Sequence, residues 1–203
     1  MKEPTDVGCF DPRPKYVDRS HESLVEFSEE TRQKLEASGF GIFSPPHRSL
    51  WELSETTYPT LVSDVLGLAM EKRSKASQCA IQLKQSFLPF HNSTEQIEKT
   101  TGLRSRLKQI EGIEVMIGNV TDYASLLTNI KKQNPKYWES FIHRIIATST
   151  TIDENAIACI SVLPSGLTVV SRPENITNDP NPIVPVTMPL IFPSVYFTHG
   201  LQK

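Results

Sequence analysis

Apolar residues recur at helical spacing through most of the first 150 residues. Between positions 60 and 88 they follow the alternating four- and three-residue steps of a heptad repeat, interrupted only by Arg73. Pro59 suits the first position of a helix, and Pro89 ends the pattern. The spacing predicts one helix of about 29 residues, roughly 43 Å long. Its apolar seam consists of Val62, Leu66, Ala69, Ala76, Ala80, Leu83 and Phe87.

A second apolar stripe follows a predicted capping box at Ser93 and Gln96. It runs from Leu103 to Ile130 with a mean step of about 3.5 residues, which favours packing of one helix on another. The segment 112–119 is ambiguous, because glycines interrupt it and its apolar residues also alternate as in a strand. We favour a helix there because the stripe continues on both sides.

Shorter elements are predicted around these two helices. An amphipathic helix begins near Ser20 and ends at Gly39, a residue that suits a C-terminal cap. Ser49 and Glu52 form a capping box before a short helical turn. A bulky apolar face predicts a further helix from Asn134-Pro135 to about Ile146.

The pattern changes beyond the Thr/Ser run at 148–151. Two apolar runs, 157–163 and 167–171, flank Pro164-Ser165-Gly166, which predicts a β-hairpin.

Prolines are concentrated at the C-terminus, where six of the 15 lie in the last 31 residues. Proline forbids a helix and cannot donate to a central ladder. The segment from Pro182 to Phe197 therefore predicts an extended strap whose apolar side chains fill grooves on the chain's own helices or on a neighbouring subunit. The candidate partner contacts are Val184, Val186, Leu190, Phe192, Tyr196 and Phe197.

Together these elements predict a mainly α fold. We expect a long antiparallel helical hairpin or bundle with coiled-coil packing, a small C-terminal β-hairpin and extended proline-rich arms. The expected divisions are an N-terminal arm over 1–20, a helical domain over 21–149, the hairpin over 150–172 and a C-terminal arm over 173–203.

The net charge of −2 provides no global positive field to hold nucleic acid, so such binding would need local patches. Three basic clusters are the candidates for phosphate contact. The competing interpretation is the ordinary charged face of exposed helices, with cations near helix C-termini. The clusters are Lys72, Arg73 and Lys75; Arg104, Arg106 and Lys108; and Lys131 with Lys132.

No motif for a nucleotide, metal or hydrolase site occurs, so we expect no catalytic residue, no cofactor and no metal ligand. A thiol nucleophile from Cys79 or Cys159 with His143 is the weaker alternative to buried structural cysteines. Three scattered cysteines, including Cys9, favour a reducing compartment. The first 20 residues show no apolar leader, and no stretch is apolar enough to span a bilayer.

These observations favour a non-enzymatic structural subunit that self-assembles or packs into a larger protein assembly. A nucleic-acid-associated structural protein of the virion or nucleocapsid type is one alternative, and an enzyme whose site is not visible in the sequence is another. The expected location is the cytoplasm or another reducing compartment, or a virion. Proline-rich arms around a helical core are also a layout of virion subunits, which is an architectural analogy only.

Overall fold

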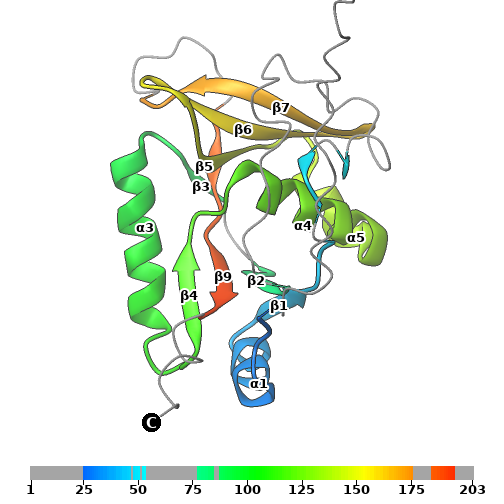
Figure 1. The fold of residues 1–203 in the computed structure, drawn as a ribbon, viewed down its shortest axis with the longest axis vertical. Helices are drawn as coiled ribbons and strands as arrows, with labels where there is room; N and C mark the ends of the chain where they lie inside the picture. The colour runs from blue at the N-terminus through cyan, green and yellow to red at the C-terminus, as the bar shows by residue number, and fades with distance from the viewer. Residues whose placement is uncertain are drawn as a thin grey trace, which may run out of the picture.

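The structure is a computed structural model that describes residues 25–46, 48–50, 52–53, 77–84, 87–175 and 184–194. These residues form two sheets with short helices between and beside them, an α/β fold (Figure 1). The longest helices in this part of the chain have 14 residues. The prediction of a mainly α fold with a long helical hairpin, bundle or coiled coil is therefore wrong.

The helices begin and end at sequence signals that act locally. Ser28 caps α1 by accepting a hydrogen bond from the Thr31 N–H, and Gly39 follows the helix with a φ of +83°. Gly39 thus confirms the predicted C-terminal cap. The helices are α1 (Glu29–Ala37), α3 (Ser93–Arg106), α4 (Val120–Gln133), α5 (Pro135–Trp138) and the 3₁₀ turn η2 (Glu139–Phe141).

The first sheet has the strand order β1-β2-β9-β4, and each neighbouring pair is antiparallel. Its strands are β1 (Phe40–Phe43), β2 (Cys79–Gln82), β4 (Ile113–Met116) and β9 (Leu190–Pro193).

The second sheet has the order β3-β8-β5-β6-β7, with β5 and β8 parallel and the other pairs antiparallel. Strands β6 and β7 confirm the predicted hairpin. The strands are β3 (Leu88–Pro89), β5 (Ile145–Asp153), β6 (Ala156–Leu163), β7 (Gly166–Pro173) and β8 (Val186–Thr187).

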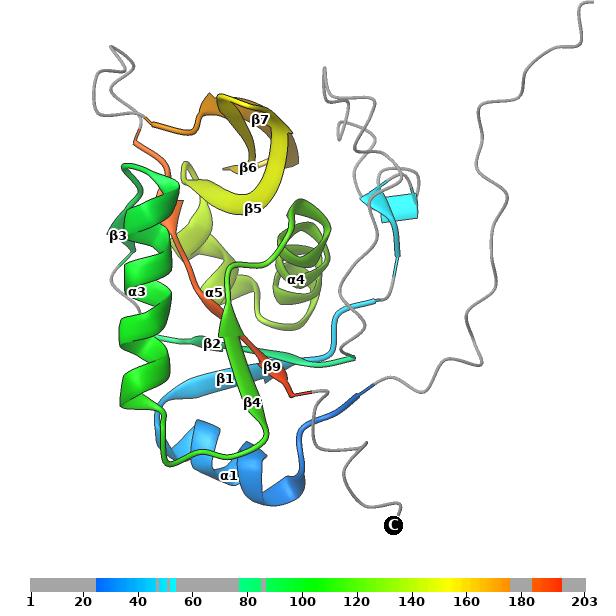
Figure 2. The same ribbon diagram turned by 60° about the vertical axis from the view of Figure 1, so that its left-hand side comes forward.

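Helix α4 lies between the two sheets and contacts β1, β5 and β6 (Figure 2). Ten of its 14 residues are buried, so it forms the centre of the main core. A helix covered on both sides needs apolar or small residues almost all round, which is why this segment resembled a long packing seam. Its fully buried large side chains are Tyr123, Leu126, Leu127 and Ile130.

The predicted helix over 60–88 is contradicted where the structure describes it. Residues 79–82 form strand β2, and Leu83 is 41% exposed rather than on a packed seam. The first three residues of β2 are all buried, so no period-two alternation marked the strand. Of this predicted helix, residues 60–76 and 85–86 lie outside the described residues.

The stripe from Leu103 to Ile130 is divided among α3, β4 and α4, so the preferred helix across 112–119 is wrong and the strand alternative is right. Gly112 adopts a φ of +72°, a left-handed conformation that a continuous helix does not allow, directly before β4 begins. A Cβ on Gly118 would lie 2.6 Å from a methyl carbon of Leu190, so the chain passes β9 closely there.

Three helix boundaries also differ from the sequence pattern. The first helix, predicted to begin near Ser20, begins at Glu29, and residues 25–28 are not helical. Asn92, rather than Ser93, caps α3 by accepting a hydrogen bond from the Glu95 N–H over 2.8 Å. The helix after Asn134-Pro135 begins as predicted but ends early, because Ile145 and its neighbours pair with β6.

The C-terminal segment was expected not to form a central strand, yet β9 lies between β2 and β4 with all four residues buried. Proline is accommodated because Pro189 precedes the strand and Pro193 is its last residue. The ladder therefore needs donors only from the residues between them. The arm predicted over 1–20 lies outside the described residues, as do Tyr196 and Phe197.

Candidate interaction surface

Strand β7 forms an open edge of the second sheet. It pairs with β6 through eight consecutive residue pairs without a bulge, and no other strand among the described residues pairs with it. In Figure 1 it is the outermost strand of the sheet. An eight-residue strand is longer than the average strand, so this edge presents an extended row of backbone groups.

The hairpin turn determines which backbone groups of β7 point outward. A two-residue turn, Pro164-Ser165, joins the strands, so its flanking pair, Leu163 and Gly166, is hydrogen-bonded. By alternation, the N–H and C=O groups of Leu167, Val169 and Ser171 point away from β6. Pro173 falls on the same outward register, where its missing N–H costs no ladder bond.

Most of this edge lacks the features that usually prevent strand pairing. Natural edges carry charges, prolines or bulges. In β7, only Arg172 and Pro173 at one end fit that description, whereas the stretch 167–170 is Leu-Thr-Val-Val. Leu167 and Val169 are buried toward α4. The edge is therefore regular and partly β-branched, and two of its side chains are packed into the core.

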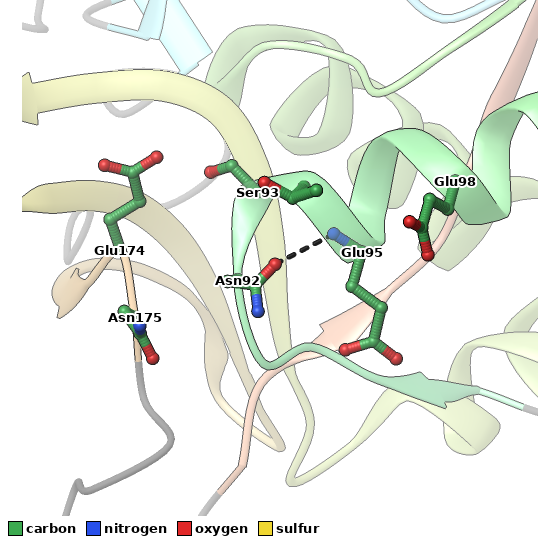
Figure 3. A pocket seen from close by; sticks show the side chains of 7 residues that line it. Asn92, Ser93, Glu95, Glu98, Glu174 and Asn175 are labelled. Carbon is green, nitrogen blue, oxygen red and sulfur yellow. Dashed lines mark hydrogen bonds between the residues drawn. The ribbon is translucent and has the colours of Figure 1, made fainter.

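Two open depressions lie at the C-terminal end of β7. One, of about 610 Å³, is lined by the β5–β6 turn together with Ser171 and Pro173. The other, of about 580 Å³, lies between the start of α3 and Glu174, and Figure 3 shows Glu174 and Ser93 on its opposite sides. Its lining residues are Asn92, Ser93, Thr94, Glu95, Glu98, Glu174 and Asn175.

These depressions are lined by acidic residues and by no lysine, arginine or histidine. Glu95 forms an ion pair with Lys99 at 2.8 Å and a hydrogen bond with the His91 ring at 2.6 Å, and the hydrogen bonds with these two residues lower its pKa. Within the described part of the chain, the other four carboxylates form no ion pair. These are Glu98, Asp153, Glu154 and Glu174.

The two cysteines considered as nucleophiles are buried in the described fold. Neither Cys79 nor Cys159 forms a disulfide, and both have almost no exposed surface. Burial raises the pKa of Cys159 to about 12, so its thiol is protonated at neutral pH and is a poor nucleophile. His143 is exposed in the turn before β5 with a φ of +67°. No group of three or more His, Cys, Asp or Glu residues suited to a metal ion occurs among the described residues.

The structure separates the two basic clusters that it describes. Arg104, Arg106 and Lys108 are exposed at the C-terminal end of α3. At the end of α4, Lys132 is exposed and the Lys131 ammonium lies 5.2 Å from the ring centroid of Trp138. The two helices lie on opposite sides of β4 in both views (Figures 1 and 2). The third cluster, Lys72, Arg73 and Lys75, lies outside the described residues.

The candidate partner contacts of the C-terminal segment differ in how far their side chains are exposed. Val184 is 43% exposed and Val186 is half-buried in β8. Leu190 and Phe192 are buried inside the chain's own core, so neither presents a surface to a partner.

Sequence reasoning did not identify the open edge of β7, although it predicted the hairpin. The signal was the absence of charge and proline from 167–170, but the order of the strands was needed to show that this strand has one free side.

No family model matches the sequence, and no significant match was found among curated proteins or among solved structures. Across the described ranges, every helix is too short or too polar to cross a lipid bilayer.

Proposed function

We propose that this chain is a non-enzymatic structural subunit of a protein assembly and that it binds its partner through the open edge of β7. The observation that carries the proposal is a regular eight-residue strand edge whose outward backbone groups have no partner in the described fold. An added strand satisfies such groups through main-chain hydrogen bonds, a common mode of protein recognition.

The energetics favour a pairing role over a solvated edge. Each backbone hydrogen bond contributes about 0.5–1.5 kcal/mol net, so a partner strand along Leu167, Val169 and Ser171 gains several such terms together. The scaffold behind the edge is already ordered by β6 and α4, which reduces the entropy lost on binding.

The absence of a disulfide at Cys79 and Cys159 supports a location in the cytoplasm or another reducing compartment. Both are enclosed in the core, where disulfide formation would require local opening.

The test compares two substitutions at one exposed residue. Ser171→Pro removes an outward N–H and adds a ring on the pairing side, whereas Ser171→Ala keeps the N–H. We expect the tagged wild-type chain and the alanine variant to elute from native cell extract well above the chain mass of 22.8 kDa. The proline variant should elute as the free chain with an unchanged melting temperature. Elution of the wild-type chain as a monomer would overturn the proposal.

Contact with nucleic acid is the second candidate function, and one observation favours it. Arg104, Arg106 and Lys108 are all exposed and form no ion pair in the described structure, so they are available to phosphate groups. The helix dipole accounts equally well for cations at the C-terminal end of α3. We therefore rank this function below protein assembly.

A further inference from the structure

We infer that the partner segment of β7 is an extended peptide with two adjacent basic residues. Its backbone would pair with the outward groups of Leu167, Val169 and Ser171, and its two cations would enter the acidic depressions at the end of the strand. This inference rests on the proposed function and specifies the chemistry of the partner.

The two depressions lie on opposite sides of the strand end. Ser171 and Pro173 point to one side and line the depression that contains Asp153 and Glu154. The chain continues to Glu174, which lines the other depression with Glu98 (Figure 3).

Side chains of an extended strand alternate between the two faces of a sheet. Two consecutive basic residues in a strand beside 171–173 would therefore point to opposite faces, one toward each depression. A single cation, or two cations separated by one residue, would reach only one of them.

Charge complementarity specifies both the sign and the position of the partner's charge. Glu98, Asp153, Glu154 and Glu174 have no ion-pair partner in the described structure. The other half of the edge, 166–170, carries no charge. The partner's basic residues are therefore expected beside the C-terminal end of β7, with uncharged residues beside 167–170.

A second copy of the chain matches this surface less well. In a two-fold antiparallel pairing of β7 with itself, the acidic end of one strand faces the Gly166 end of the other, which supplies no cation. Arg172, the only cation of the strand, points to the face opposite Ser171, and its Nε atom is buried.

The probe is a fluorescein-labelled octapeptide, TVTKRVTV, compared with the matched peptide TVTEEVTV by anisotropy on the full-length chain at low salt. We expect the Lys-Arg peptide to bind at least about tenfold more tightly, because two exposed charge pairs each change affinity by a few-fold. Glu154→Gln with Glu174→Gln should weaken that peptide by about the same factor. The matched control, Glu29→Gln with Glu36→Gln on α1, should leave binding unchanged.

Ser171→Pro separates strand pairing from general attraction to acidic residues. It should abolish peptide binding, whereas Ser171→Ala should retain it. Equal binding of the two peptides, no binding of either, or binding that survives Ser171→Pro would each overturn the inference. If Ser171→Pro nevertheless releases the chain from its native assembly, the proposed function stands. A dimer seen by light scattering and dissolved by Ser171→Pro would also overturn the inference, since the occupant would be a second copy.

Discussion

The phenol of Tyr123 donates a hydrogen bond to the backbone carbonyl of Met188, and this bond joins the central helix to the link between the two sheets. Met188 lies between β8, which belongs to the second sheet, and β9, which belongs to the first. Tyr123 is fully buried, and burial raises its pKa far above the ordinary value. The phenol therefore remains a protonated donor throughout the physiological range.

Replacing Tyr123 with phenylalanine should leave the Met188 carbonyl without its donor inside the core. We expect the free energy of unfolding to fall by about 1–3 kcal/mol, the cost of an unsatisfied buried acceptor. Urea denaturation followed by circular dichroism measures this. Tyr137→Phe is the control, because Tyr137 is half-buried and its 3.3 Å bond to Gln82 lies near solvent. Equal losses for the two variants would contradict the assignment.

The fold should lose stability at alkaline pH. Burial raises the pKa values of Cys159 and Tyr137 to about 12 each, while the unfolded chain releases these protons near about pH 8.5 and 10. Between these limits the folded state holds more protons than the unfolded state, so stability declines as pH rises. Below about pH 8.5 this contribution is fully present.

Urea midpoints measured from pH 7.5 to 11 test this decline. Cys159→Ala should flatten its first part, between about pH 8.5 and 10, and leave the steeper tyrosine part in place. A midpoint that is constant to pH 11 would show that these groups titrate normally in the fold.

The sequence predicted the helix cap and the hairpin turn correctly, but it did not reveal on how many sides β2 and α4 are buried. Gly39 after α1 and the turn at Pro164-Ser165 act through their own backbone preferences, and both were predicted correctly. The failures were at β2 and α4, whose neighbours are remote in sequence. Their residues are buried on more than one side, so apolar runs carried neither the period of a strand nor that of a single helix face.

The candidate surface could be predicted only in part, for a related reason. The sequence predicted the hairpin of β6 and β7. Which of these strands lies at the edge depends on the pairing of β8 with β5, which leaves β7 outermost. That parallel contact brings together Ile146 and Val186 from distant parts of the sequence. A single sequence has no short-range pattern that reports such a pairing.

Two glycines should respond to alanine with opposite signs. Gly102 lies within α3 with open space around its Cα, so Gly102→Ala should stabilise the protein by about 0.5–1 kcal/mol through helix propensity. Gly39 also has open space but a φ of +83°, so Gly39→Ala should destabilise it by about 1 kcal/mol through backbone strain. Thermal unfolding of both variants measures the difference. Shifts of the same sign would contradict the local geometry of one of these sites.

The exposed basic end of α3 predicts how contact with nucleic acid would behave if the second candidate function is correct. Lysine and arginine side chains on phosphates release counterions, so affinity should fall steeply as salt rises. Arg104→Ala with Arg106→Ala should reduce the slope of log affinity against log salt by about 2 and weaken binding equally for unrelated sequences.

Filter binding of duplex and single-stranded oligonucleotides from about 20 to 200 mM salt provides the measurement. Lys132→Ala with Lys136→Ala is the charge-matched control, because both residues are exposed at the ends of α4 and α5, on the other side of β4. This control should leave the slope unchanged if α3 makes the contact. An equal reduction in both double variants would mean that net charge alone governs binding. No binding at the lowest salt would remove the function, because the electrostatic contribution is strongest there.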